Sequence, residues 1–228
     1  MDLGDRMKRY EKCVSPQLIP RVPVIIRVDG RAFHTFLKGF EKPFDAEYIT
    51  SMKESAQVVA SEMQNFRIAY IQSDEATFML HSSDPRSQFW FDNKQQKMTS
   101  ISAALMTANF NRILSTHKGN LEKLAVFDAR AFNVPESDVV NIFLWRVKDW
   151  KRNSLQMYCR AHFSHKKLIG KNTEAMNKML KDSEITPWEN LPSNLRNGTF
   201  IFRDGSKTSD FDPTYEGLTD LFCNRGVL

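Results

Sequence analysis

Cysteine, glycine and proline are all scarce in this chain of 228 residues, which has three cysteines, nine glycines and nine prolines. Cys13, Cys159 and Cys223 lie far apart and form no Cys-x-x-Cys pair, which argues against a disulfide framework and against a cysteine-rich zinc site. Internal repeats and low-complexity tracts are also absent. With 41% hydrophobic and 26% charged residues, the composition is typical of a folded globular protein.

Long apolar runs are missing as well, because no stretch approaches the roughly 18 residues that a membrane span needs. The first twelve residues are charged and lack the apolar core of a secretory signal, so we expect a cytoplasmic protein with no membrane partner. The net charge of +5 permits a polyanionic partner such as nucleic acid without requiring one. There is no Walker A loop and no Gly-x-Gly-x-x-Gly, which excludes P-loop and Rossmann nucleotide sites.

Hydrophobic periodicity predicts an α+β fold with the element order β-α-β-β-α-β in residues 1–135, which is the split βαβ pattern of a ferredoxin-like sheet. The expected strands are residues 22–28, 67–72, 76–81 and 125–129, and the expected helices are residues 47–65 and 97–114. Residues 136–228 are predicted to be a mainly helical appendage packed on this domain. Within it we expect helices at 137–159 and 166–180, a strand at 198–202 and then a polar tail.

Acidic residues follow two of the predicted strands. Asp29 comes directly after the first strand, and Asp74 and Glu75 occupy the turn of the predicted hairpin. Because these strands neighbour each other in a β-α-β-β-α-β sheet, Asp29 and Asp74 should converge on one edge. Clustered carboxylates repel one another unless a cation is bound, and Mg²⁺ prefers a few carboxylates together with water and phosphate oxygens. The carbonyl of Gly30 could add a further ligand, because no side chain blocks that backbone.

Ordinary turns are the alternative explanation, since Asp and Gly are favoured in them. Basic residues nearby weigh toward phosphate chemistry, because Arg and Lys act with Mg²⁺ as clamps on a triphosphate. Each of these cations taken singly could equally be a solvated surface charge: Arg31, His34, Lys42, Lys94 and Lys97. The backbone N–H groups of residues 30–34 would also form a phosphate cradle if they open a helical turn.

Several motifs in order resemble the tRNA-His guanylyltransferase family and its guanylyltransferase-like relatives, the 3′-to-5′ RNA polymerases. The matching stretches are residues 28–36 (VDGRAFHTF), 42–45 (KPFD), 69–75 (AYIQSDE), 127–130 (FDAR) and the Trp-Arg-x-x-Asp of residues 145–149, with Lys97, Ser100 and Ser102 between them. The resemblance spans about residues 3–202. It implies a palm-like catalytic domain, in agreement with the element order.

By this resemblance, Asp29, the Gly30 carbonyl and Asp74 hold two Mg²⁺ ions, and Glu75 supports them as a catalytic residue. The resemblance also implies contacts to nucleotide or phosphate from Gly30, Arg31, Ala32, Phe33, His34, Lys42, Asp45, Ser73 and Lys97. Arg27 is expected to meet the RNA 5′ end or a second triphosphate. The implied substrates are ATP, GTP and tRNA, and the implied assembly is a homotetramer.

The implied chemistry begins with adenylylation of a 5′-monophosphate by ATP and continues with attack of the 3′-OH of an incoming nucleotide. Family members that recognise the tRNA-His anticodon carry a His-Ile-Asn-Asn-Leu-Tyr-Asn block after the Trp-Arg-x-x-Asp stretch. Here residues 151–157 are KRNSLQM, which retain only Asn153 and Leu155 of that block. The chain therefore resembles the bacterial, archaeal or phage-type relatives, and we expect templated repair of truncated tRNA, with tRNA-His-specific addition of an extra G as the alternative.

A basic surface for RNA is expected from Arg27, Lys94, Lys151, Arg152, Asn153, His165, Lys167 and Lys171, although an ordinary charged helical face would contain the same residues. Two other functions remain open at this point. A palm-type nucleotide cyclase would share the acidic pair but would not need the basic appendage. A non-catalytic RNA-binding protein would not need intact Asp29, Asp74 and Glu75.

Overall fold

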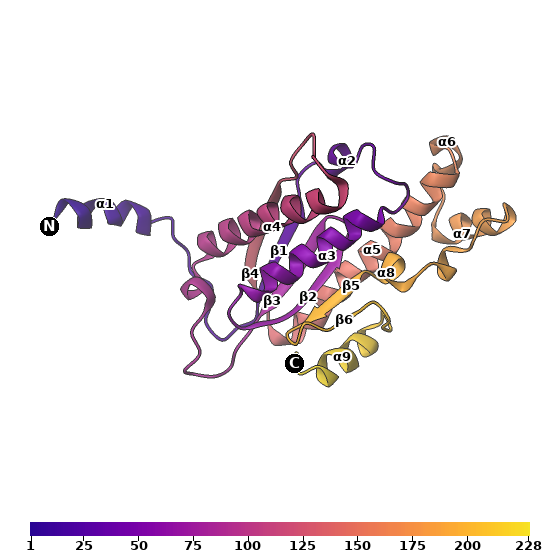
Figure 1. The fold of residues 1–228 in the computed structure, drawn as a ribbon. Coiled ribbons are helices and arrows are strands. Elements are labelled where there is room, and N and C mark those ends of the chain that lie inside the picture. Colours follow the sequence, from indigo (N-terminus) through magenta and orange to yellow (C-terminus); the bar gives the residue numbers. More distant parts are fainter.

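A six-stranded antiparallel sheet forms the centre of the protein in the computed structural model, which describes residues 1–228 (Figure 1). The strands are β1 (Val24–Gly30), β2 (Phe66–Gln72), β3 (Glu75–Leu80), β4 (Phe127–Asn133), β5 (Thr199–Phe202) and β6 (Lys207–Thr208), in the spatial order β4-β1-β3-β2-β5-β6. The first four strands, with a helix after β1 and another after β3, have the predicted β-α-β-β-α-β order. The α+β fold is therefore confirmed.

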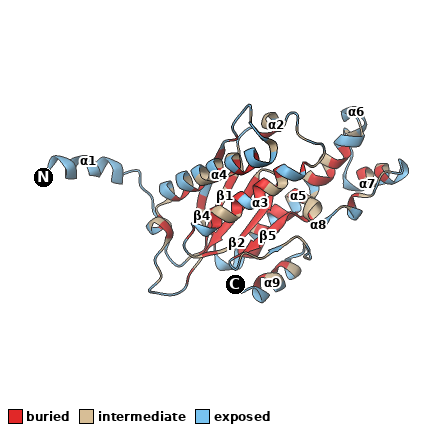
Figure 2. Ribbon diagram, viewed as in Figure 1, coloured by how far each residue is buried: buried red, intermediate tan, exposed pale blue.

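The helices are α1 (Leu3–Lys12), α2 (Phe33–Phe36), α3 (Ala46–Ser61), α4 (Gln95–Lys118), α5 (Val139–His162), α6 (His165–Leu168), α7 (Thr173–Asp182), α8 (Ser193–Asn197) and α9 (Tyr215–Asn224). Three short 3₁₀ segments cover Trp90–Asn93, Glu136–Asp138 and Trp188–Asn190. None of these helices combines the length and the apolar character needed to cross a membrane. Helix α1 stands away from the body of the molecule, and every residue in it is exposed (Figures 1 and 2).

Both faces of the sheet are covered, because successive residues of a strand point to opposite sides. In β1, Ile26 and Val28 belong to the core beneath α3 and α4, whereas Ile25 belongs to the core beneath α5 and α9. Strands β2 and β3 in the middle of the sheet are buried along almost their whole length (Figure 2). The side chains of Arg27 and Asp29, two and four positions after Ile25, therefore lie on the α5 side.

Two predictions about the C-terminal half are wrong. The helix expected at 166–180 is split into α6 and α7, because Gly170 between them has a φ of 72° and Asn172 then caps a new helix by accepting a hydrogen bond from the Ala175 N–H. The expected polar tail contains α9, which packs Leu218 and Phe222 against the sheet. The division at residue 135 stays a prediction, although β5 pairs with β2 and thus joins the same sheet.

Candidate active site

The end of β1 and the β2–β3 turn meet at one edge of the sheet, and each brings a carboxylate. Asp29 lies opposite Glu75 in the β1–β3 register, and the N–H of Gly30 donates to the carbonyl of Asp74 at 3.0 Å. The turn itself is Ser73–Asp74, and it is tight enough to hold Ser73 at a φ of 47°. Strand β1 continues two residues beyond the predicted end, so Asp29 and Gly30 are strand residues.

Negative charge at this edge is poorly compensated. Burial raises the pKa of Asp74 to about 6, the charges of Asp29 and Glu75 act in the same direction, and a hydrogen bond from Ser73 opposes the shift. No Lys, Arg or His lies within ion-pair distance of Asp74, and Asp29 has a single cation, Arg130, at 3.8 Å. The pair Asp29–Asp74 is thus a local site of unbalanced negative charge.

A divalent cation fits the oxygen atoms of Asp29, Gly30 and Asp74 when other ligands complete its coordination. Nowhere in the chain do three or more His, Cys, Asp or Glu side chains come together as a complete protein cage for a metal. Two carboxylates and a backbone carbonyl are instead the kind of incomplete set that Mg²⁺ accepts when water and substrate phosphates supply the remaining ligands. The residues therefore fit a Mg²⁺ ion that binds together with a nucleotide.

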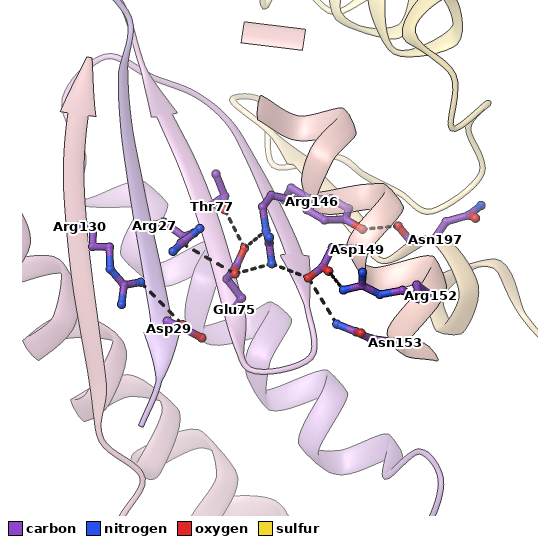
Figure 3. A network of polar contacts seen from close by, with 11 residues as sticks. Arg27, Asp29, Glu75, Thr77, Arg130, Arg146, Asp149, Arg152, Asn153 and Asn197 are labelled. Carbon is purple, nitrogen blue, oxygen red and sulfur yellow. Dashed lines mark hydrogen bonds and ion pairs between the residues drawn. The ribbon is translucent and has the colours of Figure 1, made fainter. Parts of the chain in front are cut away.

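Glu75 is engaged differently from the two aspartates. Arg146 of α5 donates to both of its carboxylate oxygens, at 2.7 Å from Nε and 2.8 Å from Nη2, and Thr77 donates to one of them at 3.2 Å (Figure 3). Burial raises the pKa of Glu75, while the Arg146 and Arg27 charges oppose that shift. Glu75 is therefore neutralised by an ion pair, so its expected role beside the metals stays a prediction.

Arg146 also extends the network away from the sheet. Its Nη2 donates to Asp149 at 3.0 Å, and Asp149 in turn accepts hydrogen bonds from Arg152 and Asn153 (Figure 3). Sequence reasoning used Arg146 and Asp149 only as part of a family motif and assigned them no role. The sequence signal that could have identified Arg146 is its position on the buried face of an amphipathic helix, because a buried charge needs a partner.

Two cavities adjoin the carboxylates and share Gln72, Ser73, Trp150 and Met157 as walls. One is a narrow, largely apolar slot of about 60 Å³ between the β2–β3 turn, α3 and the loop before α3. The other is polar, has a volume of about 350 Å³ and runs from Asp29 and Asp74 along α5. An acidic pair flanked by a slot and a polar cavity is an arrangement suited to a nucleotide and its phosphates.

Comparison with known proteins shows to which family the chain is related. The family model for tRNAHis guanylyltransferase matches residues 4–135, which is more than half of the chain. The chain belongs to the tRNA(His) guanylyltransferase family. The resemblance inferred from the motifs is confirmed, and because guanylyltransferases transfer nucleotidyl groups, the protein is a nucleotidyltransferase.

Individual family members resemble the chain over most of its length. A bacterial tRNA(His) guanylyltransferase-like protein, solved in complex with ATP, is 37% identical, with a TM-score of 0.87 over 92% of each chain. A bacterial protein of the same description, solved in complex with GTP, is 34% identical, with a TM-score of 0.73 over 88% of this chain and 83% of that one. The tRNA(His) guanylyltransferase of Schizosaccharomyces pombe is 33% identical over 65% of this chain and 56% of its own length.

Three of the family's expected nucleotide contacts line the slot: Lys42, Asp45 and Ser73. Asp45 caps α3 by accepting from the Tyr48 N–H at 2.9 Å, and it also receives the Glu41 N–H at 3.1 Å and Lys118 Nζ at 2.8 Å. Burial raises the pKa of Asp45, but these hydrogen bonds outweigh it and hold the value below normal. In this structure Asp45 organises the wall of the slot, and its contact to a nucleotide stays a prediction.

The phosphate cradle expected from the backbone N–H groups of residues 30–34 stays a prediction only for the groups after Arg31, because the helical turn α2 begins at Phe33. The N–H groups of Gly30 and Arg31 are used by Asp74 and Val126, and Ala32 turns the chain at a φ of 54°. The side chain of Phe33 is buried in the core, so only its backbone can reach a phosphate. A Cβ at Gly30 would lie 2.3 Å from the Phe33 ring, which explains the glycine at this position. Arg31 and His34 are exposed beside it.

Several predicted residues lie away from Asp29 and Asp74 or contact other side chains. Lys94 and Lys97 stand at the start of α4, which covers the sheet face opposite the Asp29 side chain. Arg27 packs on the Trp145 ring at 5.5 Å and lies 3.9 Å from Glu75. Their contacts to nucleotide or RNA stay predictions.

The predicted RNA-binding residues of the C-terminal half fall into three places. Lys151 lies 5.7 Å from the centre of the Trp188 ring, and burial lowers its pKa. Arg152 and Asn153 are hydrogen bonded to Asp149 on the wall of the polar cavity. His165 and Lys171 border a further cavity next to α6, and Lys167 is exposed. The RNA-binding surface expected from these residues therefore stays a prediction.

Proposed function

We propose that this protein adds nucleotides in the 3′-to-5′ direction to the 5′ end of truncated tRNA, using the opposite strand as template. The observation that carries the proposal is the poorly compensated Asp29–Asp74 pair on the wall of a polar cavity, next to a slot that shares residues with it, in a member of a nucleotidyltransferase family. The ATP and GTP complexes of the bacterial relatives support both nucleotides as substrates.

The reaction runs in one of two modes, according to the 5′ end of the RNA. A 5′-monophosphate oxygen attacks the α-phosphorus of ATP, which releases pyrophosphate and leaves an adenylylated end. The 3′-OH of the incoming nucleotide then attacks the 5′ phosphorus and expels AMP. A 5′-triphosphate is attacked directly and expels pyrophosphate, and in each case the hydroxyl proton passes to solvent or base. Every step is an in-line displacement at phosphorus.

The residues divide this work by charge. Asp29, the Gly30 carbonyl and Asp74 would hold two Mg²⁺ ions, which stabilise developing negative charge on the phosphoryl oxygens when bound. The backbone after Gly30 and the side chain of Lys42 would contact phosphates; Lys42 lines the slot, and Ser73 borders both cavities. Arg146 balances the negative charge of Glu75 in an ion pair, so that Asp29 and Asp74 remain the two acids open to a cation.

The proposed substrate class follows from residues 151–157 of α5. The tRNA-His-recognising block is replaced by residues 151–157 (KRNSLQM), in which Arg152 and Asn153 are tied to Asp149. This replacement favours repair of several tRNAs over strict tRNA-His specificity. A homotetramer, as implied by the family resemblance, is part of the same proposal.

Extension assays test the proposal. The protein is incubated with Mg²⁺, nucleotides and a tRNA lacking its first nucleotide, with either a 5′-monophosphate or a 5′-triphosphate end. We expect addition of the nucleotide that pairs with the 3′ partner, and ATP dependence only for the monophosphate. Asp29→Asn and Asp74→Asn should abolish addition, whereas Asp182→Asn on the exposed surface of α7 should not.

Each alternative gives a different result. Addition of G to tRNA-His alone, regardless of truncation, would indicate the tRNA-His-specific enzyme. A cyclic nucleotide formed without RNA would indicate a cyclase. Binding of tRNA with no addition at any Mg²⁺ concentration would indicate a non-catalytic RNA-binding protein and would overturn the proposal.

A further inference from the structure

One face of α5 leads from the carboxylates to a second cavity. Asp149, Asn153, Gln156 and Arg160 recur at helical spacing, and all four line the polar cavity that contains Asp29 and Asp74. Gln156 and Arg160 also line a cavity of about 110 Å³ beside α6, together with His165, Leu168, Ile169, Lys171 and Met176. Gln156 and Arg160 therefore form a wall that the two cavities share.

The charge of the walls changes sign along this path. Four carboxylates and two arginines, Arg146 and Arg160, border the first cavity, whereas the second has Arg160, His165 and Lys171 and no acidic residue. The positive end lies about 16 Å along the helix from Asp149, at 1.5 Å of rise per residue. A ligand that reaches both ends must be longer than one phosphate and negatively charged at intervals.

Arg160 differs from the other arginines of this helix. Arg146 is bound to Glu75 and Asp149, and Arg152 is bound to Asp149. Arg160 is exposed and has no hydrogen bond or ion pair within the chain. An arginine that borders two cavities without an internal partner retains its full capacity to bind a phosphate from outside.

We propose that Gln156 and Arg160 bind the sugar-phosphate backbone of the RNA substrate where it passes from the carboxylates toward α6. This inference rests on the proposed function, because the 5′ end must lie at Asp29 and Asp74. Arg160 contacts a phosphate near the 5′ end, Gln156 donates to a neighbouring oxygen, and His165 and Lys171 contact the next phosphates. Arg160 was absent from the residues expected from the sequence, while Lys94 and Lys151 lie off this path.

Binding measurements with a tRNA transcript that lacks its first nucleotide and carries a 5′-triphosphate test the assignment. For Arg160→Gln we expect the Kd for tRNA to rise about tenfold, and the slope of log K against log salt to become shallower by about 1. The Kd for ATP should stay unchanged. Arg160→Lys should restore the slope, because it restores the charge, and Arg86→Gln in the loop before α4 is the matched control.

Two results would overturn the assignment: tRNA binding by Arg160→Gln with wild-type affinity and salt slope, or loss of ATP affinity equal to the loss of tRNA affinity. The extension assay separates this failure from failure of the proposed function. If the wild-type protein extends truncated tRNA and Arg160→Gln matches it in both assays, only the path along α5 is wrong. If the wild-type protein binds no RNA, both proposals fail together.

Discussion

Replacing Arg146 by methionine should destabilise the protein more than any surface charge change on the same helix. The Arg146 and Glu75 side chains are 8% and 7% exposed, and two hydrogen bonds of 2.7 and 2.8 Å join them. Methionine fills much of the arginine volume but leaves buried Glu75 without its hydrogen-bonded cation, with only Arg27 nearby at 3.9 Å. The main effect is thus the cost of an uncompensated buried charge.

The magnitude follows from the burial. Breaking a buried ion pair by removing one partner costs about 3–5 kcal/mol. For a chain of this size, about 2–4 °C of Tm is lost per kcal/mol, so we expect Tm to fall by roughly 6–20 °C. Arg152→Met is the matched control, because Arg152 also pairs with Asp149 but its side chain is 61% exposed. That variant should lose less than about 1 kcal/mol.

The pH dependence identifies the cause. Burial raises the pKa of Glu75 and Arg146 opposes this, so removing Arg146 raises the Glu75 pKa further. An acid whose pKa is raised on folding costs stability above its folded pKa and none below its unfolded pKa. Urea denaturation should therefore show a wide gap between wild type and Arg146→Met at pH 8 that narrows as the pH falls toward 5.

Two results would refute this reasoning. The first is a loss below about 1 kcal/mol at pH 8, which would mean that Glu75 is solvated without its partner. The second concerns the double variant Arg146→Met/Glu75→Gln, in which the Glu75 carboxylate is no longer present. If it is as unstable as Arg146→Met alone, then lost packing rather than the stranded carboxylate causes the effect.

Three further predictions concern neighbouring residues. Asp74→Asn should be about 1–2 kcal/mol more stable than wild type at pH 8 and equal to it near pH 4 in urea denaturation. Burial raises the pKa of Asp74 to about 6, so the cost of its charge grows from its ordinary pKa of 3.8 up to that value and is complete above it. Lower stability of the variant at pH 8 would contradict this. Gly30→Ala should lose about 1–3 kcal/mol in thermal denaturation, because its Cβ meets the Phe33 ring, and Phe33→Leu in the same chain should recover part of the loss. Asp45→Ala should lower the free energy of unfolding by about 1–2 kcal/mol at pH 7, because the variant loses the cap of α3 and the contact to Lys118. This loss should shrink as the pH falls through the lowered pKa of Asp45. A loss that is independent of pH would exclude the ionised carboxylate as its cause.

The sheet and its long helices were predictable, because their signals are local. Residues 47–65 show the helical spacing of α3, and the Ser73–Asp74 turn separates two apolar runs that form β2 and β3. From that order, the neighbouring positions of Asp29 and Asp74 follow by topology alone. The break at Gly170 was also visible in the sequence, since a glycine followed by an Asn N-cap ends one helix and begins another.

The contact between Arg146 and Glu75 could not be predicted in the same way. The two residues are 71 positions apart, and their meeting depends on how α5 packs on the face of the sheet. Periodicity shows that α5 has an apolar side, but it does not show which face of the sheet or which strand that side covers. Helix α9 was not predicted from the sequence. Only two of its residues, Leu218 and Phe222, are fully buried, so its apolar periodicity is weak.

The position of α5 links the carboxylates to the C-terminal half of the chain. Glu75, Asp29 and Asp74 lie at one edge, and three bare carboxylates there would repel one another strongly. Arg146 neutralises Glu75 from α5, while the same helix lines the polar cavity with Asn153, Gln156 and Arg160. The two remaining acids suit a divalent ion that arrives with phosphates. A change in α5 that moves Arg146 should therefore alter both the charge at the carboxylates and the path toward α6, which makes the two halves of the chain one site.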